Sequence, residues 1–219
     1  MTRILAQTPS PPRSRREILR ARLSLTTLAL LPELRLYRAG PASRLSRLAS
    51  GESAPYWAYP WGGGLALARY LLDHPATIAQ SRVLDVGAGG GIVAIAAMKA
   101  GARAATAIDV DPNAIDAIAL NAEANAVTVA TLCGDPLDGP APDVDLVLVG
   151  DLFYEPALAA RATAFLDRCR QAGIGARIGD PGRAHLPRAR LKRLAEYQLA
   201  DFGDAPDAAT TTSAVFAFA

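Results

Sequence analysis

Asp85-Val86-Gly87-Ala88-Gly89-Gly90-Gly91 (residues 85–91) is the stretch that decides the fold of this chain. Val83 and Leu84 extend an apolar run into it, and Ile92 and Ile95 follow it at helical spacing. The pattern predicts a buried strand that runs into a glycine turn and out into a helix. Glycines let the backbone approach a ligand closely, and the start of the helix offers unpaired N–H groups to that ligand.

The spacing of the glycines predicts the kind of ligand. A dinucleotide fingerprint, G-x-G-x-x-G, would need its third glycine where Ile92 stands. Asp85 would repel a pyrophosphate and would attract a ligand with a cationic amino-acid end. The stretch resembles motif I of the seven-strand S-adenosylmethionine (SAM) methyltransferases. That resemblance implies SAM as cofactor, with Asp85 near its methionine part and Gly87, Ala88 and Gly89 in the binding turn. A nucleotide site, or a glycine turn with no ligand, is the alternative.

Size and charge are those of one ordinary domain, with 219 residues and 51% hydrophobic side chains. Residues 1–50 hold ten arginines against only Glu17 and Glu33. Such a segment can bind nucleic acid or acidic partners. The other interpretation is an arginine-preferring proteome, because Lys99 and Lys192 are the only lysines. We favour this second interpretation and expect no nucleic-acid partner.

The cysteines and histidines predict no metal site. Cys133, Cys169, His74 and His185 are dispersed along the chain and show neither metal-ligand spacing nor a disulfide framework. No apolar run approaches the length of a membrane span, so no membrane partner is expected. The Arg- and Ser-rich start has the composition of a transit peptide, but its arginine bias continues to Arg47. A cytoplasmic protein is therefore expected.

Strands alternate with helices along most of the chain. The expected helices cover 14–31 (with a Ser14–Glu17 capping box), 63–74, the segment after the glycine turn, the segment from Pro112, 156–171 and the region of Leu191, Leu194 and Ala195. One expected strand ends at Asp85, and the others cover 104–108, 127–133, 144–150, 174–179 and 210–219. This alternation predicts an α/β fold with a doubly wound parallel sheet. We expect an N-terminal tail (1–12), helix and linker (40–54) over 1–54, and a SAM-dependent methyltransferase domain over 55–219.

An aromatic loop at 55–62 (Pro-Tyr-Trp-Ala-Tyr-Pro-Trp-Gly) contains both tryptophans of the chain. Such a loop either packs the edge of the core or forms a platform for a flat ligand. The three glycines at 62–64 are one more than we expect, which would loosen the loop.

Four strand ends carry an acid, which is the strongest functional signal: Asp85, Asp109, Asp135 and Asp151. In a doubly wound sheet the ligand lies beyond the carboxyl ends of the strands. Asp109 lies about 20 residues past the glycine turn, where a carboxylate accepts both ribose hydroxyls. Val110 would press on the adenine face and Asp135 would accept its amino group. Asp111 is expected to cap the helix that starts at Pro112.

Asp151 opens the segment Asp-Leu-Phe-Tyr-Glu (151–155), which in methyltransferases faces the transferred methyl group. Enzymes that methylate planar nitrogens carry Asn/Asp-Pro-Pro-Tyr there, whereas D-x-x-Y suits an aliphatic amine. An ε-ammonium, with a pKa near 10.4, must lose a proton before it attacks. We predict that Asp151 and Tyr154 hold the amine in line with the methyl group. Alternatively, Tyr154 is an aromatic that packs the edge of the site.

From residue 55 to its end the chain resembles the bacterial counterparts of the electron-transfer flavoprotein β-subunit lysine methyltransferases, in family 16 of the protein methyltransferases. The matching segments are YWAYPWGGGLALARYLLDHP (56–75), RVLDVGAGGGIVAIAAMKAGA (82–102), AIDVDPNAIDAIALNAEAN (107–125), DLVLVGDLFYE (145–155) and GDPGRAHLP (179–187). The resemblance implies a seven-strand class I (Rossmann-like) sheet with an N-terminal helical extension.

The resemblance also implies cofactor contacts from Trp61 and Gly150 and a protein substrate, the electron-transfer flavoprotein β subunit. Two alternatives remain for the activity. The chain methylates a small amine or another protein, such as a ribosomal one, or it binds SAM without catalysis.

Overall fold

The computed structural model describes residues 14–40, 43, 54–199 and 211–219. The tail predicted over 1–12 and nearly all of the linker predicted over 40–54 lie outside the described residues. The helices are α1 (Arg15–Arg22), α2 (Gly62–Asp73), α3 (Ile92–Lys99), α4 (Pro112–Ala124) and α5 (Pro156–Gln171). The strands are β1 (Ser24–Leu28), β2 (Leu31–Arg38), β3 (Arg82–Val86), β4 (Ala104–Asp109), β5 (Ala130–Cys133), β6 (Leu146–Gly150), β7 (Gly175–Asp180), β8 (Leu191–Leu199) and β9 (Thr211–Phe218).

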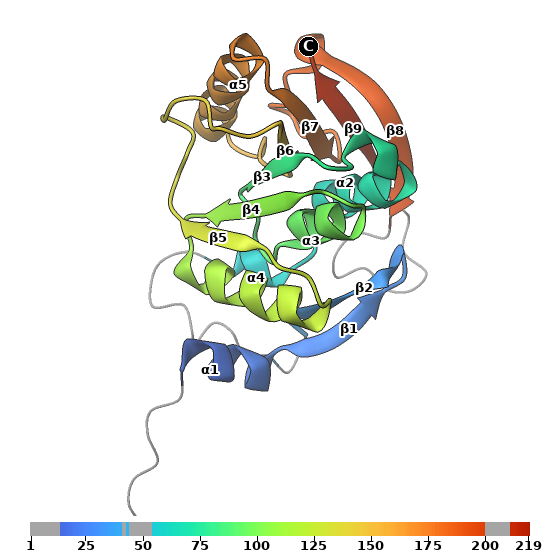
Figure 1. The fold of residues 1–219 in the computed structure, drawn as a ribbon, viewed down its shortest axis with the longest axis vertical. Coiled ribbons are helices and arrows are strands. Elements are labelled where there is room, and N and C mark those ends of the chain that lie inside the picture. The colour runs from blue at the N-terminus through green and yellow to red at the C-terminus, as the bar shows by residue number, and fades with distance from the viewer. Residues whose placement is uncertain (1–13, 41–42, 44–53, 200–210) are drawn as a thin grey trace, which may run out of the picture.

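A seven-stranded sheet of order β5-β4-β3-β6-β7-β9-β8 forms the centre of the molecule (Figure 1). Strands β3 to β7 pair in parallel, and β9 runs antiparallel to both of its neighbours. The predicted α/β fold with a seven-strand sheet is therefore confirmed. The strand order reverses between β3 and β6, which is where a doubly wound sheet binds its ligand.

Helices cover both faces of this sheet. The apolar residues of α2 and α3 share one core cluster with Val83 and Leu148, whereas those of α5 pack with Leu84 and Val149. Successive residues of a strand point to opposite faces, so each central strand supplies apolar side chains to both layers. This two-sided burial explains the unbroken apolar runs of β3 and β6.

The segment after residue 190 is a strand, and the predicted helix there is wrong. β8 pairs antiparallel with β9, and the pairing shifts its register between Arg193 and Ala195. A bulge adds one residue to a strand and interrupts its two-residue alternation. Leu191, Leu194 and Ala195 consequently fall at spacings of three and four, which imitate a helix.

The N-terminal helix is shorter than predicted. The capping box of Ser14 and Glu17 is present, but α1 ends at Arg22 and the chain continues into the antiparallel hairpin β1–β2. Thr26 and Thr27 favour a strand, and the alternation of buried Leu34 and Leu36 marks β2. Leucines of the hairpin belong to the same core cluster as α2 and α3. The division at residue 54 stays a prediction.

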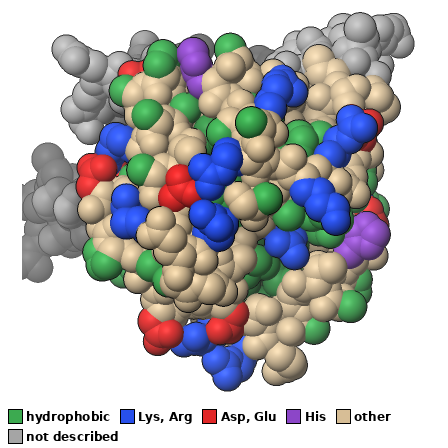
Figure 2. Space-filling model, turned by 90° about the horizontal axis from the view of Figure 1, so that it is seen from above, with side chains coloured by type: hydrophobic (Ala, Val, Ile, Leu, Met, Phe, Trp, Pro, Cys, Tyr) green, Lys and Arg blue, Asp and Glu red, His purple; other side chains and the backbone are tan. Residues whose placement is uncertain are grey.

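The arginines of α1 lie against acids of α4. Arg16 Nε contacts Asp116 Oδ1 at 3.1 Å, and Arg20 Nη2 contacts Glu123 Oε2 at 2.8 Å. Lys and Arg side chains also spread over the end of the molecule where α5, β8 and β9 lie (Figure 2). Basic side chains are thus not confined to the N-terminal segment. Among the helices of the described ranges, none combines the length and apolarity needed to cross a bilayer.

Candidate active site

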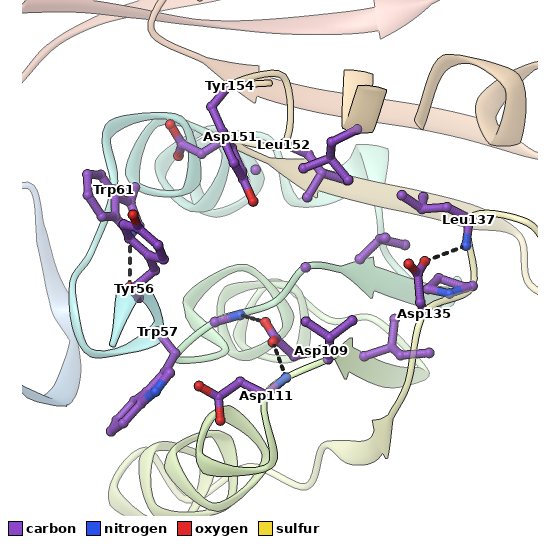
Figure 3. Close-up of a pocket in the computed structure, with 18 of the residues that line it drawn as sticks. Tyr56, Trp57, Trp61, Asp109, Asp111, Asp135, Leu137, Asp151, Leu152 and Tyr154 are labelled. Atoms are coloured by element: carbon purple, nitrogen blue, oxygen red, sulfur yellow. Dashed lines mark hydrogen bonds between the residues drawn. The ribbon is translucent and has the colours of Figure 1, made fainter. Parts of the chain in front are cut away.

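A pocket of about 290 Å³ opens at the carboxyl ends of the central strands (Figure 3). Figure 3 shows Tyr56 and Trp61 at one side, Asp135 at the other, and Asp151 across the pocket from Asp109. The lining residues are Ala54, Tyr56, Trp57, Trp61, Val86, Gly87, Gly89, Ile108, Asp109, Val110, Asp111, Gly134, Asp135, Pro136, Leu137, Gly150, Asp151, Leu152, Tyr154 and Leu158. Apolar walls with a few convergent polar groups are typical of a small-molecule site.

The glycine turn forms the floor of the pocket at the end of β3. Gly87, Gly89 and Gly91 have φ angles of +66°, +54° and +79°, a region that other residues rarely adopt. The backbone N–H groups of Gly87 and Ala88 both donate to the carbonyl of Ile108 on β4. The turn is thereby held against β4, with no side chain at Gly87 or Gly89 to fill the space above it.

Asp109, at the end of β4, holds the turn from the side. Its Oδ2 accepts the N–H of Gly89 at 2.8 Å, and its Oδ1 accepts the N–H of Asp111 at 2.9 Å. Burial raises the pKa of Asp109 above its usual value, and these N–H donors oppose the rise. Each carboxylate oxygen keeps one further lone pair for a hydroxyl donor. Asp111 caps α4 as predicted, because its side chain accepts the N–H of Asn113.

Asp135, after β5, lies at the opposite end of the pocket from Trp61 (Figure 3). Its Oδ1 accepts the N–H of Leu137 at 2.9 Å, and its Oδ2 contacts Arg161 Nη2 of α5 at 2.8 Å. The carboxylate is therefore fixed in orientation next to the apolar side chain of Leu137. An apolar side chain next to a hydrogen-bond acceptor suits a purine-like ring, whose face is apolar and whose edge carries an amino group.

Asp151 follows β6 directly and adopts a strained backbone conformation. Its φ is +58°, which is uncommon for a residue other than glycine. The side chain is only 9% exposed, and its Oδ2 accepts the N–H of Gly64 at 2.7 Å. Burial raises the pKa of Asp151, while Gly64 and the guanidinium of Arg183 oppose the rise. Strain of this kind clusters at functional sites and persists where surrounding contacts hold it.

Aromatic side chains form the mouth of the pocket. Trp61 Nε1 donates to the carbonyl of Tyr56 at 2.9 Å, and the two rings lie 6.0 Å apart. Tyr56 and Tyr154 are each 58% exposed and line the pocket. Burial and the neighbouring charge of Glu155 raise the pKa of Tyr154. The aromatic loop thus contributes to the pocket itself, while buried Trp57 also packs against α4.

Most of the predicted site residues come together in this pocket. Those that line it are Trp61, Gly87, Gly89, Asp109, Val110, Asp135, Gly150, Asp151 and Tyr154. Sequence reasoning did not single out Tyr56, Trp57, Leu152 or Arg183. The aromatic composition of the loop pointed to Tyr56 and Trp57, and Gly-Asp-Pro-Gly-Arg was noted without a role for its arginine.

Asp85 and Ala88 are outside the pocket lining. Asp85 lies within β3, is 1% exposed, and accepts the N–H of Ala94 at 3.0 Å. The side-chain alternation of β3 turns it toward α3, beneath the glycine turn. Burial raises the pKa of Asp85 to about 7. Its predicted contact with the cofactor stays a prediction.

Within the described ranges, no group of three or more His, Cys, Asp or Glu side chains is arranged to hold a metal ion. The ionisable side chains that line the pocket are carboxylates and the phenols of Tyr56 and Tyr154.

Comparison with known proteins gives two kinds of relative. Residues 67–151 match the family described as Ribosomal protein L11 methyltransferase (PrmA). The electron transfer flavoprotein beta subunit lysine methyltransferases of Danio rerio and Rattus norvegicus are 43% and 42% identical over 170 and 172 residues. These alignments cover 75% and 76% of this chain and 66% and 68% of the two relatives. The matched segment thus spans about two thirds of the length of these relatives.

Solved structures share the fold at lower identity. A Pyrococcus horikoshii protein described as a candidate RNA methyltransferase superposes with a TM-score of 0.55 at 15% identity, over 78% of this chain and 90% of that one. A Thermoplasma acidophilum protein gives a TM-score of 0.52 at 20% identity, over 70% and 88% of the two chains. At these identities the likeness concerns the fold alone.

Proposed function

Since the chain belongs to the family of electron transfer flavoprotein beta subunit lysine methyltransferases, we propose that it is a SAM-dependent protein-lysine N-methyltransferase that acts on that subunit. One observation carries the proposal: Asp109, Asp135 and Asp151 line a single pocket at the carboxyl edge of the sheet. We place the reaction in the cytoplasm, a reducing compartment that suits the free thiols of Cys133 and Cys169.

The residues of the pocket fit SAM in three respects. Asp109 keeps lone pairs for the ribose hydroxyls beside the N–H of Gly89 that it already binds. Ile108 and Leu137 offer apolar walls to an adenine, with Asp135 next to them as acceptor for its amino group. The bound donor would supply a sulfonium-activated methyl group.

Asp151 and Tyr154 would act on the amine that receives the methyl group. The lysine ammonium must lose a proton before its nitrogen attacks. Asp151, which lines the pocket and whose pKa burial raises, would accept that proton and hold the amine by a hydrogen bond. Tyr154 reaches the same pocket from the exposed mouth, where its hydroxyl would fix the second N–H. Fixing the nitrogen in line with the methyl carbon lowers the entropic part of the barrier.

The acidic lining also favours a cationic substrate. Exposed phenols at the mouth suit the aliphatic stem of a lysine, because aromatic faces pack against methylene groups and attract ammonium ions. A ribosomal protein is the second candidate substrate, because residues 67–151 match the L11 methyltransferase family.

Methyl transfer to the two candidate substrates tests the proposal. The purified chain, tritiated SAM and either the flavoprotein β subunit or ribosomal protein L11 are incubated together, and the labelled residues are mapped by mass spectrometry. We expect label on lysines of the flavoprotein subunit and none on L11. Label on L11 alone, or none on either protein, would reject the proposed substrate.

Two variants test the site in the same assay. Asp151→Asn should leave the SAM dissociation constant nearly unchanged and lower turnover by at least about tenfold. Asp143→Asn, a 93% exposed carboxylate near the opposite end of β6, should retain full turnover. Unaltered turnover of Asp151→Asn would remove this residue from the mechanism.

A further inference from the structure

Arg183, which lies outside the pocket lining, forms an ion pair with Asp151, which lines the pocket. Arg183 Nη2 donates to Asp151 Oδ1 at 2.9 Å. The Arg183 side chain is 27% exposed and that of Asp151 is 9% exposed, so the pair is shielded from most of the solvent. Ion pairs of this kind orient both partners more strictly than exposed ones do.

The turn after β7 is built to aim Arg183. Asp180 is fully buried at the end of β7, and its Oδ1 accepts the N–H groups of Gly182 and Arg183, each at 2.7 Å. Gly182 has φ +93°, which a side chain would oppose. Arg188 Nη2 binds the carbonyl of Gly182 at 2.9 Å from the outer side. Hydrogen bonds thus hold the backbone of the Gly-Asp-Pro-Gly-Arg turn in place, which fixes the point from which the side chain of Arg183 extends.

Asp151 is held at three points. Its N–H donates to the carbonyl of Gly179 at 3.0 Å, Gly64 binds Oδ2, and Arg183 binds Oδ1. Its positive φ needs such support, because a free residue would relax. Of the three contacts, only the one from Arg183 comes from a side chain and can be removed without rebuilding the backbone.

We propose that Arg183 is a positioning residue that acts through Asp151, fixing its carboxylate so that the unused lone pairs face the substrate amine. The proposal rests on the proposed function of Asp151. Arg183 does not line the pocket, so we assign it no contact of its own with cofactor or substrate. Its removal should therefore affect turnover and spare both affinities.

Kinetics of Arg183→Met and Arg183→Lys test this role, with Arg193→Met, a 62% exposed arginine of β8, as the control. Arg183→Met should lower kcat by about 10- to 100-fold, with the SAM Kd and the KM for the protein substrate within about twofold. Arg183→Lys, which keeps the charge, should recover part of kcat, and Arg193→Met should match the wild type. In an Asp151→Asn background, Arg183→Met should lower kcat only slightly further. A raised KM at constant kcat, or full additivity of the two changes, would overturn the proposal.

A measurement without substrate separates this proposal from the assigned activity. The carboxyl ¹³C signal of Asp151, identified by its loss in Asp151→Asn, is titrated by NMR. The charged groups facing Asp151 are Arg183 and Asp180. Removal of the guanidinium leaves burial and Asp180 unopposed by a cation, so Arg183→Met should move this titration to higher pH. An unchanged titration would overturn the positioning role even if the chain methylates the flavoprotein subunit. A shifted titration would uphold it even if the natural substrate is another amine.

Discussion

The backbone N–H of Gly64 donates to Asp151 Oδ2 at 2.7 Å, and this bond joins the first turn of α2 to the end of β6 across 87 residues. The start of a helix carries a partial positive charge, which stabilises a nearby carboxylate. The contact is possible because the neighbouring residue, Gly63, lies directly against the backbone of Gly179. The glycines at 62–64 therefore begin a helix packed on the sheet, which starts one residue before the predicted start at Gly63.

Gly63→Ala should displace α2 from the site. A Cβ at this position would lie 2.2 Å from the carbonyl oxygen of Gly179 and 2.7 Å from Asp151 Oδ2. Alanine favours a helix by about 1 kcal/mol over glycine, so any loss arises from the clash. We expect the free energy of unfolding in urea to fall by about 1–3 kcal/mol, with a drop in turnover. Gly40→Ala, with no atom within 4 Å of the added carbon, is the control. Equal stability of the two variants would contradict the close packing of α2.

Asp109→Ala should weaken SAM binding. The variant loses the acceptor of the Gly89 N–H and the lone pairs assigned to the ribose hydroxyls. Hydrogen bonds to a charged group contribute about 1.5–3 kcal/mol each, so the Kd should rise by about 10- to 100-fold. Isothermal titration calorimetry measures the change. Asp116→Ala on α4, which pairs with Arg16 away from the pocket, should bind SAM like the wild type. An unaltered Kd in Asp109→Ala would mean that the ribose lies elsewhere.

The central sheet could be predicted because its signals are local. β3, β4 and β6 are apolar runs with an acid at their last residue or one residue from it, and α5 covers the predicted range of 156–171. β8 could not be predicted from spacing, because its bulge is specified by pairing with β9. The hairpin β1–β2 was hidden by the strong capping signal of α1, although Leu34 and Leu36 alternate.

The site residues that could be predicted are those next to the end of a strand in the sequence. Asp109, Asp135 and Asp151 each follow or end a strand and line one pocket. Asp85 also lies near the end of its strand, but the alternation of side chains along β3 points its carboxylate toward α3, beneath the glycine turn. Arg183 reaches Asp151 across 32 residues, a contact that depends on how β6 and β7 pair.

Tyr154→Phe should affect turnover more than binding. The change removes one hydroxyl from an exposed ring at the mouth and keeps the packing of the ring. A neutral hydrogen bond contributes about 0.5–1.5 kcal/mol, so kcat should fall by about 3- to 10-fold with the SAM Kd unchanged. Tyr56→Phe removes the same hydroxyl from the other exposed phenol and should lower kcat by a smaller factor. If both variants lose activity equally, the hydroxyl of Tyr154 has no special part in holding the amine.

Asp85 should make the stability of the protein depend on pH. Burial raises its pKa to about 7 in the folded state, above the value of about 3.9 in an unfolded chain. The folded state then binds this proton more tightly than the unfolded state does. The stabilisation is fully present below about pH 4 and is lost as pH rises through about 7. Between pH 5 and 8 the free energy of unfolding should fall by an amount on the order of 2 kcal/mol.

Asp85→Asn tests this assignment, because an amide does not titrate and its oxygen can still accept the Ala94 N–H. Urea unfolding between pH 5 and 8 should show a flatter dependence in this variant than in the wild type. Asp145→Asn is the matched control. Arg82 lowers the pKa of Asp145 to about 2, so its contribution is lost only as pH falls below about 4. Equal slopes for Asp85→Asn and the wild type would show that Asp85 is ionised throughout this range, and that its burial is compensated by a cation or by water.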